Sequence, residues 1–355
     1  MERTKRDGHP HRESGRTHWV SWLALLLAGA VGYGMVACSS MSKATLERRL
    51  FDLEKNAPAK ARGLSRLPIT VNLHGQTQQV ELVYLHVPAA NGDPEGDPVV
   101  LVHGTPATLF TWVPVIFGEP GVPGLSATRD VYAIEVIGHG VAPGDGSPYT
   151  FETCADFVVA AIRGLGLERV NLVGNSYGGE FVWRAALNAP ELIHSVTLMH
   201  ASGYARKDGE WLPEEVVMRE NRLAKFGWLL NSRKRVLSAL EPHFRGVPPE
   251  RAEEIFLVCE NAHNWKAMID LVRDENGSRE HELGHIACPA LILWGAREIA
   301  YPLETFGQRF VHDIPGAQLR VLDDCGHYPQ EEHPALVVAA LGEFFRSLEN
   351  QAENR

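Results

Sequence analysis

Cysteine is scarce in this chain, and its placement gives no sign of a metal site. Five cysteines occur in 355 residues, and no two of them stand at the short spacing of a zinc site or a redox motif. Cys154, Cys259, Cys288 and Cys325 are far apart in the sequence. A disulfide among them and four unpaired buried thiols are therefore both open interpretations.

Positive charge is also in deficit. The chain holds 34 Lys and Arg against 44 Asp and Glu, which gives a formal net charge of −10. It has no long basic stripe of the kind that binds nucleic acid. We therefore expect no nucleic-acid partner and interpret the negative charge as a contribution to solubility.

Internal repeats and low-complexity segments are lacking as well. Hydrophobic residues make up 45% of the chain and charged residues 22%, the ordinary balance of a globular protein with a large core. The 33 glycines and 22 prolines are scattered and indicate many short turns. The length fits one large domain with an insertion, or two small domains.

One long uncharged run is present near the N-terminus, over residues 19–37. It follows a polar, mildly basic segment, which is the pattern of a signal peptide. The run ends just before Cys38 and resembles the signal of bacterial lipoproteins, which implies lipidation of Cys38. An uncleaved membrane anchor is the alternative.

Both interpretations make residues 1–38 a membrane-anchoring segment. Residues 39–68 then look like a tether, formed by a short charged helix and a linker rich in Pro, Ala and Arg. The expected localisation is the cell envelope, with the rest of the chain held at a membrane outside the cytoplasm.

Short β-branched apolar runs alternate with helical stretches along the rest of the chain. This alternation predicts an α/β fold with a mostly parallel central sheet and helices on both faces. We expect a hairpin and six further strands at 69–73, 80–87, 98–102, 131–137, 170–173, 195–199, 290–294 and 318–322. The clearest helices are expected at 151–165, 177–188 and 334–348.

The strand signal disappears between residues 203 and 288. Trp, Arg, Glu and Leu recur there at helical spacing, which predicts a helical insertion that covers the sheet as a lid. The core then consists of residues 69–202 and 289–355.

The strongest functional signal is Gly174-Asn-Ser176-Tyr-Gly178, between an expected strand and an expected helix. A sharp strand-to-helix turn pushes the serine into a strained, exposed position, so the residues two positions before and after it must be very small. The helix that follows offers backbone N–H groups and a positive dipole end to a developing oxyanion. This context favours a nucleophilic serine over an ordinary glycine-rich turn.

Two further segments support this interpretation, His103-Gly104-Thr105 after the strand at 98–102 and a Gly-His-Gly turn at 138–140. With the elbow, they resemble the α/β-hydrolase family over nearly all of residues 69–348. The resemblance implies that the backbone N–H groups of Thr105 and Tyr177 form an oxyanion hole. It also implies that His103 is structural, because the family's base comes later in the chain.

The segment after the last expected strand resembles the family's histidine loop. It implies His327 as general base, in preference to His333, which looks like the start of the closing helix. The acid should follow the strand at 290–294, where Glu298 stands in the place of the usual Asp; Asp324 is the alternative. The chain order Ser176, Glu298, His327 is that of α/β-hydrolases.

One competing motif is present in His281-Glu-Leu-Gly-His285, which matches the zinc metalloprotease pattern. That pattern needs a stable helix with both histidines on one face, whereas Gly284 interrupts it and a strand is expected directly afterwards. We therefore expect no metal and no cofactor.

The leading hypothesis is a serine hydrolase that cleaves a carboxylic ester of a small-molecule acyl substrate through an acyl-enzyme. Hydrolysis of a carbon–carbon bond or of an amide uses the same machinery and remains open. A tethered, non-catalytic binding protein is the other alternative, because a fold does not fix a function. The lid aromatics either pack the lid or line an acyl pocket: Trp211, Phe226, Trp228 and Trp265.

Overall fold

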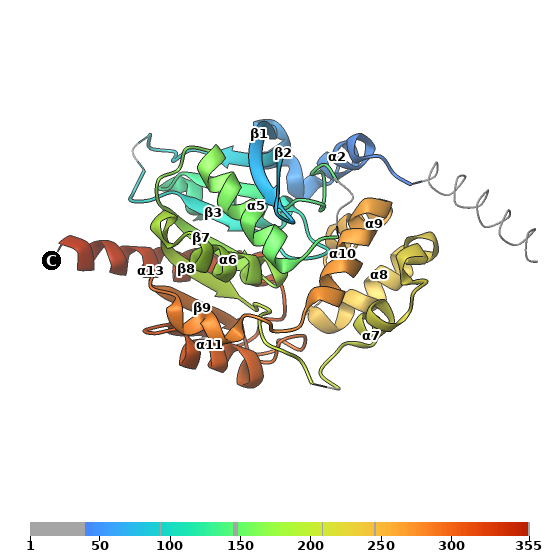
Figure 1. Cartoon of the computed structure of the whole chain (residues 1–355). Helices are drawn as coiled ribbons and strands as arrows, with labels where there is room; N and C mark the ends of the chain where they lie inside the picture. The colour runs from blue at the N-terminus through green and yellow to red at the C-terminus, as the bar shows by residue number, and fades with distance from the viewer. Residues whose placement is uncertain (1–39, 93, 145–147, 208, 245, 354–355) are drawn as a thin grey trace, which may run out of the picture. The chain divides into compact units, whose positions relative to one another are not determined.

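The computed structural model describes residues 40–353, except residues 93, 145–147, 208 and 245 (Figure 1). Residues from Met41 onward form one compact unit. The apolar run at 19–37 and Cys38 lie outside the described residues. Within the described part of the chain, no helix is both long enough and apolar enough to cross a bilayer.

An eight-stranded sheet forms the centre of the compact unit, in the order β1-β2-β6-β3-β7-β8-β9-β10. β1 pairs with β2 and β2 pairs with β6 in antiparallel fashion, and the remaining neighbours in this sheet are parallel. The mostly parallel sheet is therefore confirmed. The strands are β1 (Ser65–Leu73), β2 (Gln76–Val87), β3 (Val99–Val102), β6 (Val131–Glu135), β7 (Val170–Asn175), β8 (Ile193–Met199), β9 (Ala290–Gly295) and β10 (Gln318–Leu322). A separate two-stranded ribbon joins β4 (Gly118–Glu119) to β5 (Val122–Pro123).

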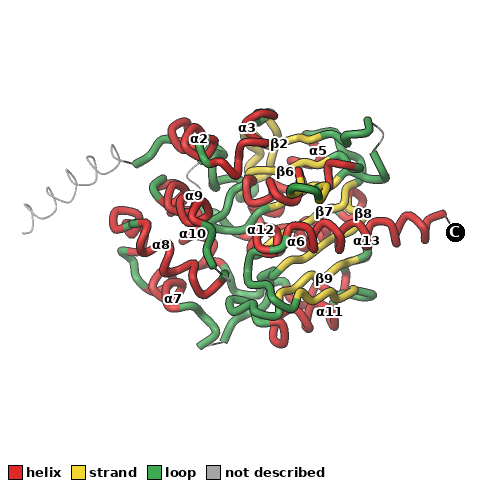
Figure 2. The backbone as a smooth tube through the Cα atoms, turned by 180° about the vertical axis from the view of Figure 1, so that it is seen from behind, coloured by secondary structure: helices red, strands yellow, loops and turns green. Residues whose placement is uncertain are grey.

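Helices cover both faces of the sheet, because its central strands are apolar on both sides. Every residue of β3 is buried, and alternate residues contribute to two different cores: Val100 and Val102 to one, Val99 and Leu101 to the other. The first core includes α5 (Phe151–Gly164), α6 (Tyr177–Asn188) and α11 (Gln308–Asp313). The second includes α4 (Val113–Phe117) and α13 (Pro334–Glu353), and Figure 2 shows α13 from behind.

The stretch 203–288, which was expected to form a lid, contains no strand among its described residues, and we refer to it as the lid. Its described helices are α7 (Pro213–Glu220), α8 (Arg233–Leu240), α9 (Pro249–Cys259), α10 (Ala262–Asp274) and the 3₁₀ helices η5 (Ala224–Leu230), η6 (Glu241–His243) and η7 (Glu280–His285). Helices α7, α8, α9 and α10 lie together at one side of the sheet (Figure 1). The side chain of Asn261 begins α10 by accepting hydrogen bonds from the backbone N–H groups of His263 and Asn264.

The segment at 39–68 differs from the expected tether. From Met41 onward it packs on the compact unit as α2 (Lys43–Phe51) and α3 (Ala57–Arg62), and β1 already begins at Ser65. Leu46 and Leu50 are four residues apart on α2 and are completely buried, because this spacing puts both on one helix face. Because many charged residues surround these two leucines, the apolar face of α2 was not recognised from the sequence.

Candidate active site

Ser176 occupies the turn between β7 and α6. Its φ of 57° and ψ of −127° lie in a region that non-glycine residues rarely adopt. Its neighbours are glycines for a steric reason: a Cβ on Gly174 would lie 2.3 Å from the carbonyl oxygen of Gly178, and one on Gly178 would lie 2.5 Å from that of His103. The turn that presents the serine is therefore possible only with glycine at both places.

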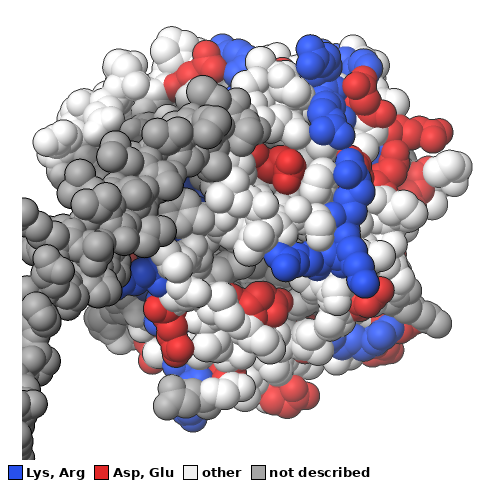
Figure 3. Space-filling view, turned by 90° about the vertical axis from the view of Figure 1, so that its right-hand side faces the viewer, with Lys and Arg blue, Asp and Glu red and all other residues white. Residues whose placement is uncertain are grey.

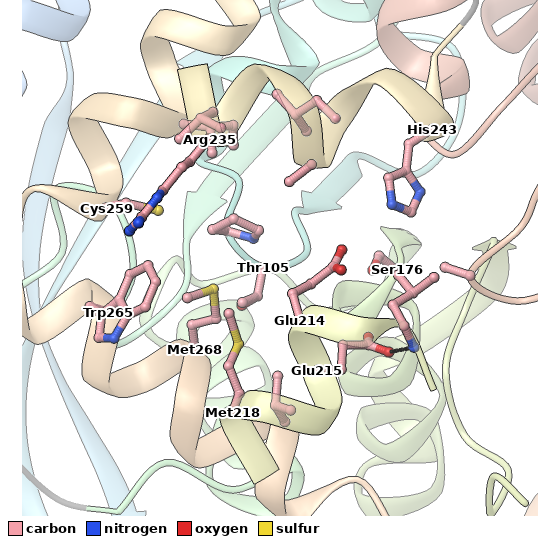
Figure 4. A pocket seen from close by; sticks show the side chains of 18 of the residues that line it. Thr105, Ser176, Glu214, Glu215, Met218, Arg235, His243, Cys259, Trp265 and Met268 are labelled. Atoms are coloured by element: carbon pink, nitrogen blue, oxygen red, sulfur yellow. Dashed lines mark hydrogen bonds between the residues drawn. The ribbon is translucent and has the colours of Figure 1, made fainter. Parts of the chain in front are cut away.

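The structure brings His327 and Glu298 together. Nδ1 of His327 lies 2.5 Å from Oε2 of Glu298, and both side chains are buried. His327 and Ser176 line the same cavity (Figure 4 labels Ser176). Because Nδ1 is engaged by the carboxylate, Nε2 is the nitrogen left to act on the serine hydroxyl.

The loop after β9 holds the Glu298 carboxylate as an anion. Its Oε1 accepts hydrogen bonds from the backbone N–H groups of Ala300, at 2.5 Å, and Tyr301, at 3.1 Å. Burial by itself raises the pKa of Glu298, but the imidazoles of His327 and His200 and the donated hydrogen bonds lower it from 4.5 to about 2. A charged carboxylate is what orients and stabilises an imidazolium.

The alternative acid, Asp324, points elsewhere. Its carboxylate lies 3.1 Å from Arg297, and 45% of its side chain is exposed. His333 likewise contacts the backbone carbonyl of Asp324 and does not line the cavity with Ser176. The geometry thus favours Glu298 and His327 over the two competitors.

His200 is a member of this cluster that sequence reasoning missed. Its Nε2 accepts from the backbone N–H of Gly295 at 2.6 Å, so its Nδ1 donates to the carbonyl of His327 at 3.1 Å. Burial lowers the pKa of His200 to about 4, despite the carboxylate of Glu298 3.7 Å away. A neutral imidazole thus supports the loop of the base. The available signal was its place directly after β8, at the carboxyl edge of the sheet.

The lid also reaches the loop of His327. The backbone N–H of His327 donates to the carbonyl of His243 at 3.0 Å. A Cβ on Gly326 would lie 2.2 Å from that same oxygen, which explains the glycine before the base. Burial above all lowers the pKa of His243 to about 4, and the neighbouring imidazole of His327 acts in the same direction. No local sequence pattern indicates His243.

The two expected oxyanion-hole residues border the nucleophile. Thr105 and Tyr177 line the cavity beside Ser176. A Cβ on Gly104 would lie 2.7 Å from the Cβ of Ser176, so this loop approaches the nucleophile as closely as a backbone can. His103 is completely buried, and its Nε2 accepts from the backbone N–H of Val136 at 3.1 Å, as a structural residue would.

A cavity of about 340 Å³ extends from Ser176 beneath the lid. Its walls are mainly apolar, and they include Leu212, Met218, Val236, Ile255, Trp265 and Met268. In Figure 4, Ser176 and His243 lie at one side, with Cys259, Trp265 and Arg235 at the other. Of the four lid aromatics singled out from the sequence, Trp265 lines this cavity.

The zinc-type motif is not built as a zinc site needs. His281 and His285 are both exposed and lie on a short 3₁₀ helix, Glu280–His285, where residues four apart do not share a face. Among the described residues, the group close enough to hold a metal is His200, Glu298 and His327. Both nitrogens of His200 are already used in hydrogen bonds, which leaves it no lone pair for an ion.

The profile described as "Alpha/beta hydrolase family" matches residues 99–340. The chain belongs to this family. Among curated relatives, this α/β-hydrolase is 27% identical to the uncharacterized hydrolase YugF of Bacillus subtilis, over 72% of the chain and 92% of the relative. It is 28% identical to the 2-hydroxy-6-oxo-2,4-heptadienoate hydrolase of Pseudomonas putida, over 70% of the chain and 89% of the relative.

Solved structures share the fold at lower identity. A thermophilic esterase from Thermogutta terrifontis matches with a TM-score of 0.66 and 23% identity, over 80% of this chain and 99% of its own. A bacterial membrane phospholipase A matches with a TM-score of 0.64 and 22% identity, over 94% and 99%. The family makes the protein a hydrolase, and the solved structures share its expected fold.

Proposed function

We propose that this hydrolase cleaves carboxylic esters with an apolar acyl group, by way of an acyl-enzyme on Ser176. The observation that carries the proposal is the strained elbow that presents Ser176 to the cavity also lined by the Glu298-bound His327. Nε2 of His327 takes the hydroxyl proton as Oγ attacks the carbonyl carbon. The backbone N–H groups of Thr105 and Tyr177 hold the oxyanion.

The tetrahedral intermediate then collapses to the acyl-enzyme, which water hydrolyses by the reverse path. His327 gives its proton to the leaving alcohol, and Ser176 keeps the acyl group. Water enters, loses a proton to His327 and attacks the ester carbonyl, and the proton returns to Ser176 as the carboxylic acid leaves. One water is consumed, and the enzyme regains its starting state.

The charges around the cavity favour a neutral ester over a small anionic substrate. Glu214 and Glu215 line the cavity, and Arg235 is the one Lys or Arg among its described lining residues. Arg235 lies far from Ser176 in Figure 4. A dienoate such as the one named for the Pseudomonas relative carries a carboxylate, which Glu214 would repel, and the guanidinium of Arg206 is already paired with Glu215.

The test compares p-nitrophenyl esters of increasing acyl length with a 2-hydroxy-6-oxo-dienoate on the full chain. We expect turnover of the esters, and a loss of at least about 10⁴-fold in kcat for Ser176→Ala. Ser238→Ala, at an exposed serine of α8, is the matched control and should leave kcat unchanged. Turnover of the dienoate alone would favour carbon–carbon hydrolysis. A folded protein without turnover would favour the binding role.

A further inference from the structure

Exposed apolar side chains are concentrated on the lid. Ten large apolar residues are exposed among the described residues, and six of them fall between residues 216 and 237. The exposure of Leu223 reaches 68% and that of Leu230 reaches 63%, which is unusual for leucines of a folded chain. We call the exposed side of residues 216–237 the lid surface. Its apolar members are Val216, Val217, Leu223, Leu229, Leu230 and Leu237.

The lid surface is also basic, although the whole chain is acidic. Residues 216–237 contain six Lys or Arg and a single Glu, in a chain with a net charge of −10. Figure 3 views the molecule from the lid side and shows Lys and Arg side chains in a band beside uncharged surface. Among the described residues, no carboxylate pairs with Arg222 or Lys234, both of which are exposed. Their positive charge is therefore free to act on a partner.

The cavity opens onto the same surface. Leu230 and Arg235 line the cavity that contains Ser176, and both are exposed. Figure 4 shows Arg235 at the side of the cavity away from Ser176. An apolar molecule that enters from the lid surface would thus reach Ser176 through an apolar passage.

The N-terminal connection of the compact unit lies beside the lid. The backbone N–H of Met41 donates to the carbonyl of Glu260 at 3.2 Å, and the side chain of Asn261 donates to the carbonyl of Met41 at 2.6 Å. These two partners form the junction between α9 and α10. The membrane anchor expected in residues 1–38 would therefore join the compact unit next to the lid.

We propose that the lid surface docks on an anionic lipid bilayer, with its leucines in the headgroup boundary and its lysines and arginines on the lipid phosphates. Apolar side chains rimmed by cations are what binds such interfaces. The charge of the surface is complementary to anionic lipid, whereas a second copy of this chain would bring the same positive charge to the interface. Docking needs no hydrolysis and is independent of the proposed reaction.

The test places a tryptophan at Leu223→Trp and, as matched control, at Leu336→Trp in the full chain. Leu336 is 51% exposed and belongs to α13, whose label lies on the other side of the molecule from the lid helices in Figures 1 and 2. Vesicles of brominated phosphatidylglycerol and phosphatidylcholine quench tryptophan at the bilayer boundary. The fluorescence of the parent chain is subtracted, and a Ser176→Ala background separates docking from turnover.

We expect quenching at position 223 to exceed that at position 336 by about fivefold, to fall with added salt and to be lost on pure phosphatidylcholine. Arg222→Glu with Lys234→Glu should abolish it, whereas Arg346→Glu on α13 should not. Equal quenching at the two positions would show attachment by the N-terminus alone and overturn the proposal. Quenching of equal strength on anionic and on neutral vesicles would also overturn the proposal. So would a dimer that buries position 223 in the absence of lipid.

Discussion

The hydroxyl of Tyr177 donates a hydrogen bond of 2.8 Å to Oε2 of Glu275, and so joins the residue after the nucleophile to the end of lid helix α10. The other oxygen, Oε1, accepts from Tyr301 at 3.2 Å and lies 3.0 Å from Nε of Arg206. Burial raises the pKa of Glu275 to about 7, although Arg206 acts in the opposite direction. The lid is thereby connected to two of the segments that form the site.

Tyr177→Phe should separate the side chain of this residue from its backbone. We expect a loss of about 1–3 kcal/mol in the free energy of unfolding, because a buried carboxylate loses a donor. The kcat should fall by less than about tenfold, since the backbone N–H that serves the oxyanion remains. Urea denaturation and ester hydrolysis measure the two effects.

Tyr204→Phe is the control for that variant, because Tyr204 is buried and donates to Asp313 at 3.0 Å, outside the cavity. It should lower stability and leave kcat unchanged. A loss of kcat of about 10²-fold or more in Tyr177→Phe alone would mean that the hydroxyl takes part in the chemistry.

The identity of the triad acid is decided by comparing Glu298→Gln with Asp324→Asn. We expect Glu298→Gln to lower kcat by roughly 10³–10⁴-fold, because the imidazolium of His327 loses its charged partner. Asp324→Asn should change kcat by less than about twofold, because this carboxylate is at the surface with Arg297. A larger effect at Asp324 would contradict the assignment.

Acid should remove the stability that Glu298 provides. The pKa of this carboxyl is about 2 in the folded protein against an ordinary 4.5, so between these values the unfolded chain binds more protons than the folded one. Its contribution is therefore complete above about pH 4.5 and is lost as the pH falls toward 2. The stability advantage of the wild type over Glu298→Gln, measured as a difference in unfolding free energy, should therefore become smaller as the pH is lowered from 6 to 3. If this difference in unfolding free energy stays constant with pH, the pKa of Glu298 is the same in the folded and the unfolded protein.

Lys55 tests whether the segment before β1 is part of the fold. Its ammonium pairs with Glu254, which is completely buried, and lies 3.6 Å from Glu331. Lys55→Ala should cost about 3 kcal/mol in unfolding free energy, because it leaves a buried carboxylate short of a cation. Lys60→Ala breaks only an exposed pair with Asp52 and should cost less than about 1 kcal/mol. Equally small effects would return this segment to the role of a loose tether.

The sheet was predictable because each central strand is a short, mostly apolar run between turn signals. β7 and α6 were expected within two residues of their bounds, since Gly174 and Pro190 punctuate the chain there. The segment before β1 was not predictable in the same way. Its two buried leucines are surrounded by charges whose partners lie about two hundred residues away, in lid helix α9.

The site residues likewise fall into those with a local sequence pattern and those that depend on contacts between distant segments. Ser176 and His327 stand in local patterns that a strained turn and a loop after the last strand impose on the sequence. Glu298 was expected from its place after β9, and the structure puts its carboxylate on His327. His200 and Glu275 act through contacts between segments distant in sequence, and no local pattern records such contacts.

The ion pairs of α2, α3 and the turn between them also limit how far the enzyme can be truncated from its N-terminus. A recombinant chain that begins at residue 41 retains Leu46, Leu50 and the cation for Glu254. One that begins at residue 69, where the strand signal starts, would uncover the wall of the second core and leave the buried carboxylate of Glu254, on lid helix α9, without its lysine. For expression, domain fusion or circular permutation, the usable N-terminal boundary of this hydrolase is therefore Met41.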